Sequence, residues 1–436
     1  MLSQKLDSIS NECIEKYLKC FGKSHKNHSK FHYFEMLILF AAFSLSALND
    51  NQPLITQELV DKVNNDPHSS FRARLNPRFA KMTIGQAKKF LSPVRKIPVN
   101  HGSARPVGAD ENAFKLYDKR MIVGLSNPEH KPDDVTLKPV IYDNSNFCSS
   151  WATAVTSAMS LALSIHSKKF INLSIQFILD CDLMGDPCIE RPPLNAYEPF
   201  WQRFIPQTQR WDQPDLKNGK PHFLRSPPKE LTKEICDSQL STDCYPGWNK
   251  CPKNRVLSGE CTPGKDDSNC PIYFLYNWKW IKSHLWEVGP VTSSIIARQS
   301  LFAYDSGVYS SIGTYQPGDE AQPTYSEIVG MLDVTIIGWG QIENELNETA
   351  FNQTHNRWWY VIPHFGKDFG EPCEVIFTAD ELTEYDCPSG SRSGVMRFNR
   401  RFDDSNIESQ AVGAVPFNFQ PKPYRTPRPT WKRYQE

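Results

Sequence analysis

The stretch Asn144–Ile165, NSNFCSSWATAVTSAMSLALSI, decides the fold of this chain. Its apolar side chains recur at three- and four-residue steps, which predicts a helix with one apolar face. Ser149 and Ser150 stand where the N-cap or first turn of that helix belongs. The positive end of a helix dipole stabilises a developing anion, so this is a natural place for a nucleophile. In this chain a serine occupies it. The apolar positions are Trp151, Ala154, Val155, Ala158, Met159, Ala162 and Ile165.

Length and composition indicate a globular protein. The chain has 436 residues, which is enough for one large or two small domains with a real core. Its formal net charge is +0, so electrostatics give no case for a nucleic-acid or membrane-surface partner. A hydrophobic content of 39% with 33 prolines favours a loop-rich protein over a helical bundle.

The cysteines favour an oxidising compartment. The chain contains 12 cysteines, and their spacing lacks a paired C-x2-C. A disulfide framework is therefore favoured over a zinc site, and we expect no metal and no cofactor. The disulfide candidates are Cys148, Cys181, Cys188, Cys236, Cys244, Cys251, Cys261, Cys270, Cys373 and Cys387.

Residues 36–47, MLILFAAFSLSA, are a short apolar run that ends in small residues. This pattern is typical of a secretory signal peptide, with a cut after Ser46 or Ala47. The run is too short to span a bilayer, which needs about 20 residues, and no other stretch is long and apolar enough. Residues 1–35 then have two interpretations: an upstream extension that is not translated, or a very long n-region. We expect a secreted, extracellular protein, with the lysosome as the alternative.

The phrase FCSSW at Phe147–Trp151 resembles the C-G-S-C-W signature of papain-family cysteine peptidases. Laid on without a gap, it puts Ser150 at the nucleophilic cysteine. The rest of the chain supports this resemblance because further family segments follow in the expected order. They are NLSIQFILDC at 172–181, GDPC at 185–188, GPV at 289–291, SGVY at 306–309, IIGWG at 336–340 and WWYV at 358–361.

The resemblance extends over residues 50–417 and is to cathepsin B-like members, similar also to the tubulointerstitial nephritis antigen group. It implies an α+β papain-like fold, with a helical left subdomain, an antiparallel β right subdomain and an N-terminal propeptide. In residues 53–98 we expect a short amphipathic helix and then a segment that together fill the cleft. The implied organisation is an upstream extension at 1–35, a signal peptide at 36–47, a propeptide and linker at 48–115, a cathepsin B-type domain at 116–417 and a disordered basic tail at 418–436.

A papain-type site needs a thiolate, an imidazole, an amide that orients the imidazole, and an oxyanion hole. Under the resemblance, the catalytic histidine falls on Leu332, the orienting asparagine on Pro363 and the oxyanion glutamine on Asn144. With Ser150, all three triad positions are changed, so we expect no functional catalytic residue.

Three neighbouring residues carry side chains of the kind that a substitute site would need. Adjacent side chains on a strand point to opposite faces, so we expect Asp333 and His364 to face away from the site. Cys148 is the remaining substitute, although the resemblance implies that it is the displaced half of a disulfide to Cys181.

Two further features concern the cleft wall and the surface of the protein. Glu190 and Arg191 replace two family glycines, so a peptide could not lie against them as it does against glycine. Sequons at Asn172, Asn347 and Asn352 predict glycosylation and fit a secreted surface.

The sequence thus predicts a secreted cathepsin B-like pseudopeptidase that acts by binding extracellular matrix, peptides or active peptidases. The alternative is an active cysteine-type peptidase that uses Cys148 or a shifted site.

Overall fold

A computed structural model describes residues 50–67, 69–93, 121–123, 139–144, 149–181, 197, 272–275, 277–311, 326–341, 357–377, 387–400 and 403–415. The predicted upstream extension, signal peptide and basic tail lie outside these residues. So do Cys148, Cys188, Glu190, Arg191, Asn347, Asn352 and the five cysteines from Cys236 to Cys270. Cys181 ends a helix, but its side chain is not described.

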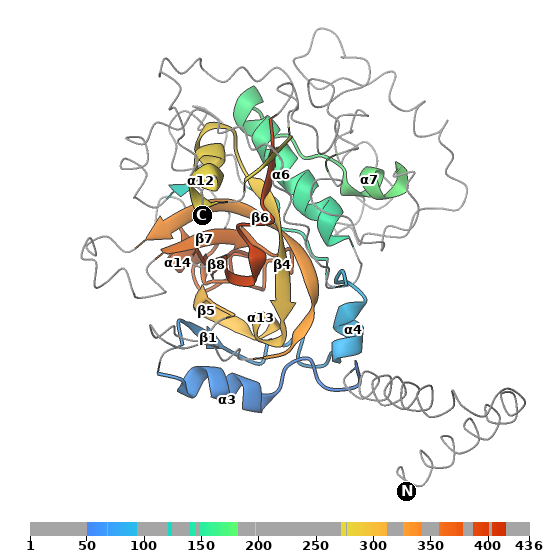
Figure 1. The fold of residues 1–436 in the computed structure, drawn as a ribbon, viewed down its shortest axis with the longest axis vertical. Coiled ribbons are helices and arrows are strands. Elements are labelled where there is room, and N and C mark those ends of the chain that lie inside the picture. The colour runs from blue at the N-terminus through green and yellow to red at the C-terminus, as the bar shows by residue number, and fades with distance from the viewer. Residues whose placement is uncertain are drawn as a thin grey trace, which may run out of the picture. The chain divides into compact units, whose positions relative to one another are not determined.

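A nine-stranded sheet is the central element of the described residues (Figure 1). Its spatial order is β1-β5-β8-β7-β6-β4-β9-β3, and β2 pairs with β6 outside this path. All pairs are antiparallel except β5 with β8. The strands are β1 (Phe71–Ala73), β2 (Met121–Ile122), β3 (Ile272–Phe274), β4 (Val291–Arg298), β5 (Tyr304–Tyr309), β6 (Ile328–Gln341), β7 (Arg357–Ile362), β8 (Met396–Asn399) and β9 (Val412–Ala414).

Strand β6 is central because it pairs with both β4 and β7. Its register with β7 is irregular: Ile336 lies opposite Val361, whereas Gly338 lies opposite Tyr360. Two steps on β6 therefore match one step on β7, which is a β-bulge. A bulge reverses the alternation of side chains along the strand, so the residues before Ile336 and those after Gly338 alternate in opposite phase.

Helix α6 (Ser150–Ser167) packs against β6 and β4, as Figure 1 shows. Every residue from Ser150 to Ile165 is buried, so the helix is enclosed on all sides and not only along its apolar face. Three of its hydroxyls, at Thr156, Ser160 and Ser164, bond to backbone carbonyls one turn earlier. Thr156 Oγ1 donates to the oxygen of Ala152 at 2.5 Å, and Ser160 Oγ to that of Thr156 at 2.6 Å.

Further helices complete the described elements. They are α7 (Ile175–Cys181), α12 (Trp278–Glu287), α13 (Gln299–Phe302), α14 (Cys373–Ile376) and the 3-10 turn η3 (Asp404–Asn406). Cys373 and Cys387 form a disulfide with a Cα–Cα distance of 5.7 Å, which confirms these two disulfide candidates. A helical part built on α6 and an antiparallel sheet thus lie together, as expected from the sequence.

The N-terminal segment (residues 53–93) carries α3 (Gln57–Asn65), β1 and α4 (Ile84–Lys88). The helix predicted after residue 53 is present, with Val60 and Val63 on its buried side. Thr56 caps it by accepting a hydrogen bond from the backbone of Leu59. Strand β1 adds to the sheet beside β5, so this segment is part of the same compact unit as the residues that follow (Figure 1).

Candidate functional site

Ser150 is the first residue of α6 and meets a carboxylate instead of an imidazole. Its Oγ donates to Asp333 Oδ2 at 3.4 Å, and the backbone nitrogen of Asp333 donates to Ser150 Oγ at the same distance of 3.4 Å. Ser294 on β4 donates its hydroxyl to the other carboxylate oxygen of Asp333. Ser150 and Asp333 are each only 2% exposed, so this polar cluster is closed to solvent.

The prediction that Asp333 faces away from the site is wrong, because its carboxylate accepts from Ser150. Leu332, the family position of the histidine, is 1% exposed and belongs to the hydrophobic core. Neighbouring side chains on a strand point to opposite faces, so Leu332 lies on the other face of β6 from Asp333.

His364 also lies on the α6 side of the sheet, contrary to the prediction. Strand β7 ends at Ile362, and His364 has a left-handed backbone with φ of 58°, so strand alternation does not extend to it. Its Nε2 lies 2.9 Å from Thr335 Oγ1, and that hydroxyl donates to the oxygen of Ala154 at 3.1 Å. Because the hydroxyl has one proton and gives it to Ala154, His364 must donate from Nε2.

The imidazole of His364 is held in its neutral form. Its side chain is 0% exposed, and burial lowers its pKa from 6.5 to about 3. Its Nδ1 has no hydrogen-bond partner among the described residues. A histidine is therefore near α6, but it is bonded to Thr335 rather than to Ser150.

Asn144 and Pro363 complete the positions predicted for the site. Asn144 Oδ1 accepts from Thr153 Oγ1 at 3.0 Å, and the backbone nitrogen of Asn144 donates to the oxygen of His364 at 2.8 Å. The amide of Asn144 is thus fixed to the first turns of α6. Pro363 is buried and offers no side-chain donor or acceptor. Ser149 caps α6 by position, but its hydroxyl makes no capping bond.

Three polar residues of this cluster were missed from the sequence as members of the site: Asp333, Ser294 and Thr335. Asp333 and Thr335 are two residues apart in a strand that is otherwise apolar, and this period-two spacing puts them on one face. That spacing was the signal available in the sequence. Ser294 became visible only through the pairing of β4 with β6, which sets it opposite Asp333.

Chemically, the cluster is suited to mutual hydrogen bonding and not to nucleophilic attack. Asp333 accepts hydrogen bonds from both Ser150 and Ser294, whereas a papain-type nucleophile is paired with an imidazole. In the described part of the chain, no group of three or more His, Cys, Asp or Glu side chains could hold a metal ion.

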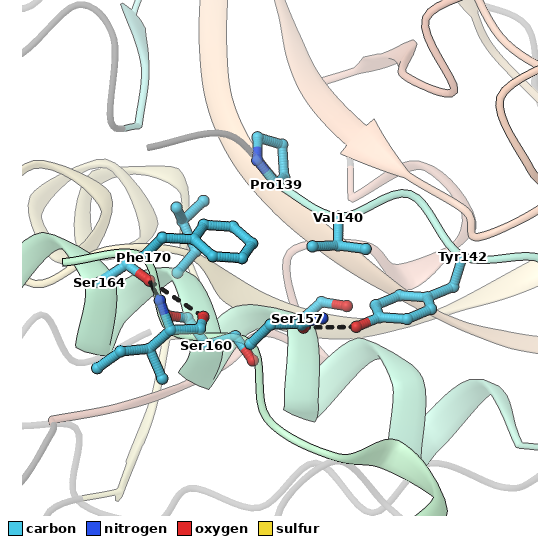
Figure 2. A pocket seen from close by; sticks show the side chains of 10 residues that line it. Pro139, Val140, Tyr142, Ser157, Ser160, Ser164 and Phe170 are labelled. Carbon is cyan, nitrogen blue, oxygen red and sulfur yellow. Dashed lines mark hydrogen bonds between the residues drawn. The ribbon is translucent and has the colours of Figure 1, made fainter. Parts of the chain in front are cut away.

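Farther along α6, serines dock the chain that follows the helix. Figure 2 shows a pocket there, lined by Pro139, Val140, Tyr142, Ser157, Ser160, Leu161, Ser164, Phe170, Ile171 and Asn172. Ser164 Oγ accepts from the backbone nitrogen of Ile171 at 2.8 Å, and Tyr142 donates its hydroxyl to Asn172 Oδ1 at 2.6 Å. The predicted sequon at Asn172 is thus built into packed structure.

Comparison with known proteins gives the family. The sequence profile of papain family cysteine proteases matches residues 135–375, which is more than half of the chain. The chain belongs to the papain family of cysteine proteases. Two relatives are cathepsin B-like cysteine proteinases 1 and 2 of Haemonchus contortus, each 24% identical over 246 residues. These matches cover 53% of this chain and 65% of each relative, so the chain spans less than two thirds of the relatives' length.

The fold predicted from the sequence is confirmed. The structure is similar to that of procathepsin B S9 from Trypanosoma congolense, with a TM-score of 0.52 and 18% identity. The similarity covers 84% of this chain and 99% of that structure. The chain therefore has a papain-like α+β fold with a propeptide, in a cathepsin B-like papain-family domain. Within the part that the structure describes, no helix has the length and apolar character to cross a membrane.

Proposed function

We propose that this papain-family protein is a cathepsin B-like pseudopeptidase that binds a protein or peptide ligand and does not cleave it. The observation that carries the proposal is the hydrogen bond between Ser150 and Asp333. Ser150 donates to this carboxylate, whereas a papain-type nucleophile is bonded to an imidazole. His364 is neutral and bonded to Thr335.

Extracellular matrix, peptides and active peptidases are the ligands proposed from the sequence. Secretion is proposed from the apolar run at 36–47, with the lysosome as the alternative compartment. The sequons Asn347 and Asn352 fit either compartment because both are reached through the secretory pathway.

The activity test uses hydrolysis of a dipeptide reporter, with an active cathepsin B-like peptidase as the positive control. We expect the wild-type protein and a Ser150→Ala variant to give the same background rate. A wild-type rate above that of Ser150→Ala would contradict the proposal.

A second measurement addresses a peptidase that uses Cys148. A peptidyl epoxide labels only an activated thiolate, so we expect no labelling of the wild-type protein. Labelling that disappears in a Cys148→Ala variant would instead establish the alternative function.

A further inference from the structure

The N-terminal segment (residues 53–93) shares one hydrophobic core with the domain that it contacts. Phe79 is 0% exposed and lies edge-on to three rings. The ring centroids of Phe302, Phe365 and Phe369 are 5.2, 5.1 and 6.2 Å from that of Phe79. Phe90 of the same segment packs against Phe302 at 6.3 Å. This apolar contact contains no titratable group, so acidification does not weaken it directly.

Backbone hydrogen bonds join the segment to two strands of the domain. The backbone nitrogen of Val308 on β5 donates to the oxygen of Ser70 at 2.9 Å. Farther along, the nitrogen of Ser92 donates to the oxygen of Met331 on β6 at 2.9 Å, and the nitrogen of Met331 donates to Ser92 at 2.7 Å. The segment is thus held at its middle and at its C-terminal end by groups that do not change charge with pH.

Two glycines let the segment approach this closely. A Cβ added to Gly307, which has φ of +96°, would lie 2.5 Å from the oxygen of Ser70. A Cβ added to Gly330 would lie 2.9 Å from both Leu91 Cβ and the oxygen of Ser92. Gly330 requires no left-handed backbone, so its missing side chain serves the contact with the segment and not a turn.

Ionic contacts also hold the segment against the domain. One of the residues that make them, Arg78, has a further hydrogen bond that does not depend on an ionised carboxylate. Arg78 pairs with Asp143 at 2.5 Å and with Asp368 at 2.7 Å. It also donates to the backbone oxygen of Phe365 at 2.6 Å. That carbonyl remains an acceptor when carboxylates are protonated, so Arg78 keeps a bond to the domain in acid.

We infer that the N-terminal segment is a permanent part of the folded protein, which stays bound after the chain is cut between it and residue 121. Its contact with Met331 lies two residues from Asp333 on the same strand. The inference rests on the proposed function only in that the protein does not cut itself.

The test supplies the cut from outside. A recognition sequence for a specific protease is inserted within residues 99–115 of the full chain, and the protein is cut and passed over a size-exclusion column at about pH 7 and at about pH 4.5. We expect both fragments to elute together at both pH values and to separate in denaturant. Separate elution at either pH without denaturant overturns the inference.

Variants identify which contacts retain the segment. Phe79→Ala removes the buried ring and should speed release of the cut segment by about 100-fold or more. Leu75→Ala is the matched control, because Leu75 is an apolar residue of the same segment that is 41% exposed, and it should leave release unchanged. Gly330→Ala gives a second measurement from the domain side and should also speed release. Equal release rates for the Phe79→Ala, Gly330→Ala and Leu75→Ala proteins overturn the account.

The outcomes separate this inference from the proposed function. Release of the segment without hydrolysis of a dipeptide reporter overturns the inference and leaves the pseudopeptidase proposal intact. Hydrolysis by the cut protein above that of its Ser150→Ala variant overturns the proposed function instead.

Discussion

Ser150 and Asp333 are 183 positions apart in the sequence, yet the serine hydroxyl donates to the aspartate carboxylate at 3.4 Å in a closed cluster. An imidazolium beside a papain-type nucleophile stabilises a thiolate, whereas a carboxylate in that place disfavours any anion next to it. With a carboxylate in place of an imidazolium, the neighbouring group therefore destabilises an anion at position 150 instead of stabilising it. It also gives the site a defined chemistry that can be tested by substitution.

We expect Ser150→Cys alone not to create a peptidase. The helix dipole lowers a thiol pKa, but the carboxylate of Asp333 and burial both raise it, so the thiol pKa should be above the free value of about 8.5. The measurement is the rate of alkylation by iodoacetamide as a function of pH. Reporter hydrolysis by Ser150→Cys above a Ser150→Ala control would refute this account of the site.

A histidine at position 333 tests whether Asp333 is the residue of β6 that lies beside position 150. In Ser150→Cys with Asp333→His, an imidazole replaces the carboxylate beside the thiol, so the thiol pKa should fall below about 8.5 and alkylation at neutral pH should become faster. Turnover should remain absent, because Pro363 has no side-chain group that could orient the imidazole.

The matched control is Ser150→Cys with Leu332→His, the position first predicted from the sequence. There the histidine would enter the hydrophobic core, destabilise the protein by several kcal/mol and leave the thiol unactivated. Faster alkylation in this control than in the Asp333→His variant would show that position 332, and not position 333, lies beside position 150.

The sequence predicted the order of elements and the start of α6 because those rest on periodicity and on motifs that are read locally. It could not place Asp333 beside Ser150, because that contact joins residues 183 positions apart and depends on how α6 packs against β6. His364 was misplaced because alternation was extended past the end of β7, where its φ of 58° turns the chain. Ser294 reaches Asp333 through pairing between strands distant in sequence, which no local pattern encodes.

His364 should make the protein less stable in acid. Burial lowers its folded-state pKa from 6.5 to about 3, so the unfolded chain binds the proton more readily below about pH 6.5. The stability from the neutral imidazole is therefore fully present above pH 6.5 and is lost as the pH falls toward 3, by about 1.4 kcal/mol per pH unit for this one group.

The measurement is chemical denaturation of the wild type and of His364→Gln between about pH 7 and pH 4, where Gln can still donate to Thr335. His166 and His284 also have pKa values lowered to about 4 by burial, so only the difference between the two proteins reports His364. The free energy of unfolding of His364→Gln should fall less steeply with acid. Parallel curves would show that His364 is not buried as a neutral imidazole.

Glycosylation should distinguish the three sequons. Asn172 accepts a hydrogen bond from Tyr142, and the next two residues, Leu173 and Ser174, are each 0% exposed. The hydroxyl of Ser174 caps α7 by accepting from the backbone nitrogen of Phe177 at 3.0 Å. A glycan on Asn172 would have to disturb this packed turn, so we expect glycans on Asn347 and Asn352 and none on Asn172. Protein secreted from eukaryotic cells should lose apparent mass on deglycosylation and in the Asn347→Gln and Asn352→Gln variants. The matched Asn172→Gln variant should run unchanged, and a lower mass for that variant would mean that the turn before α7 opens during synthesis in a way that the folded packing does not show.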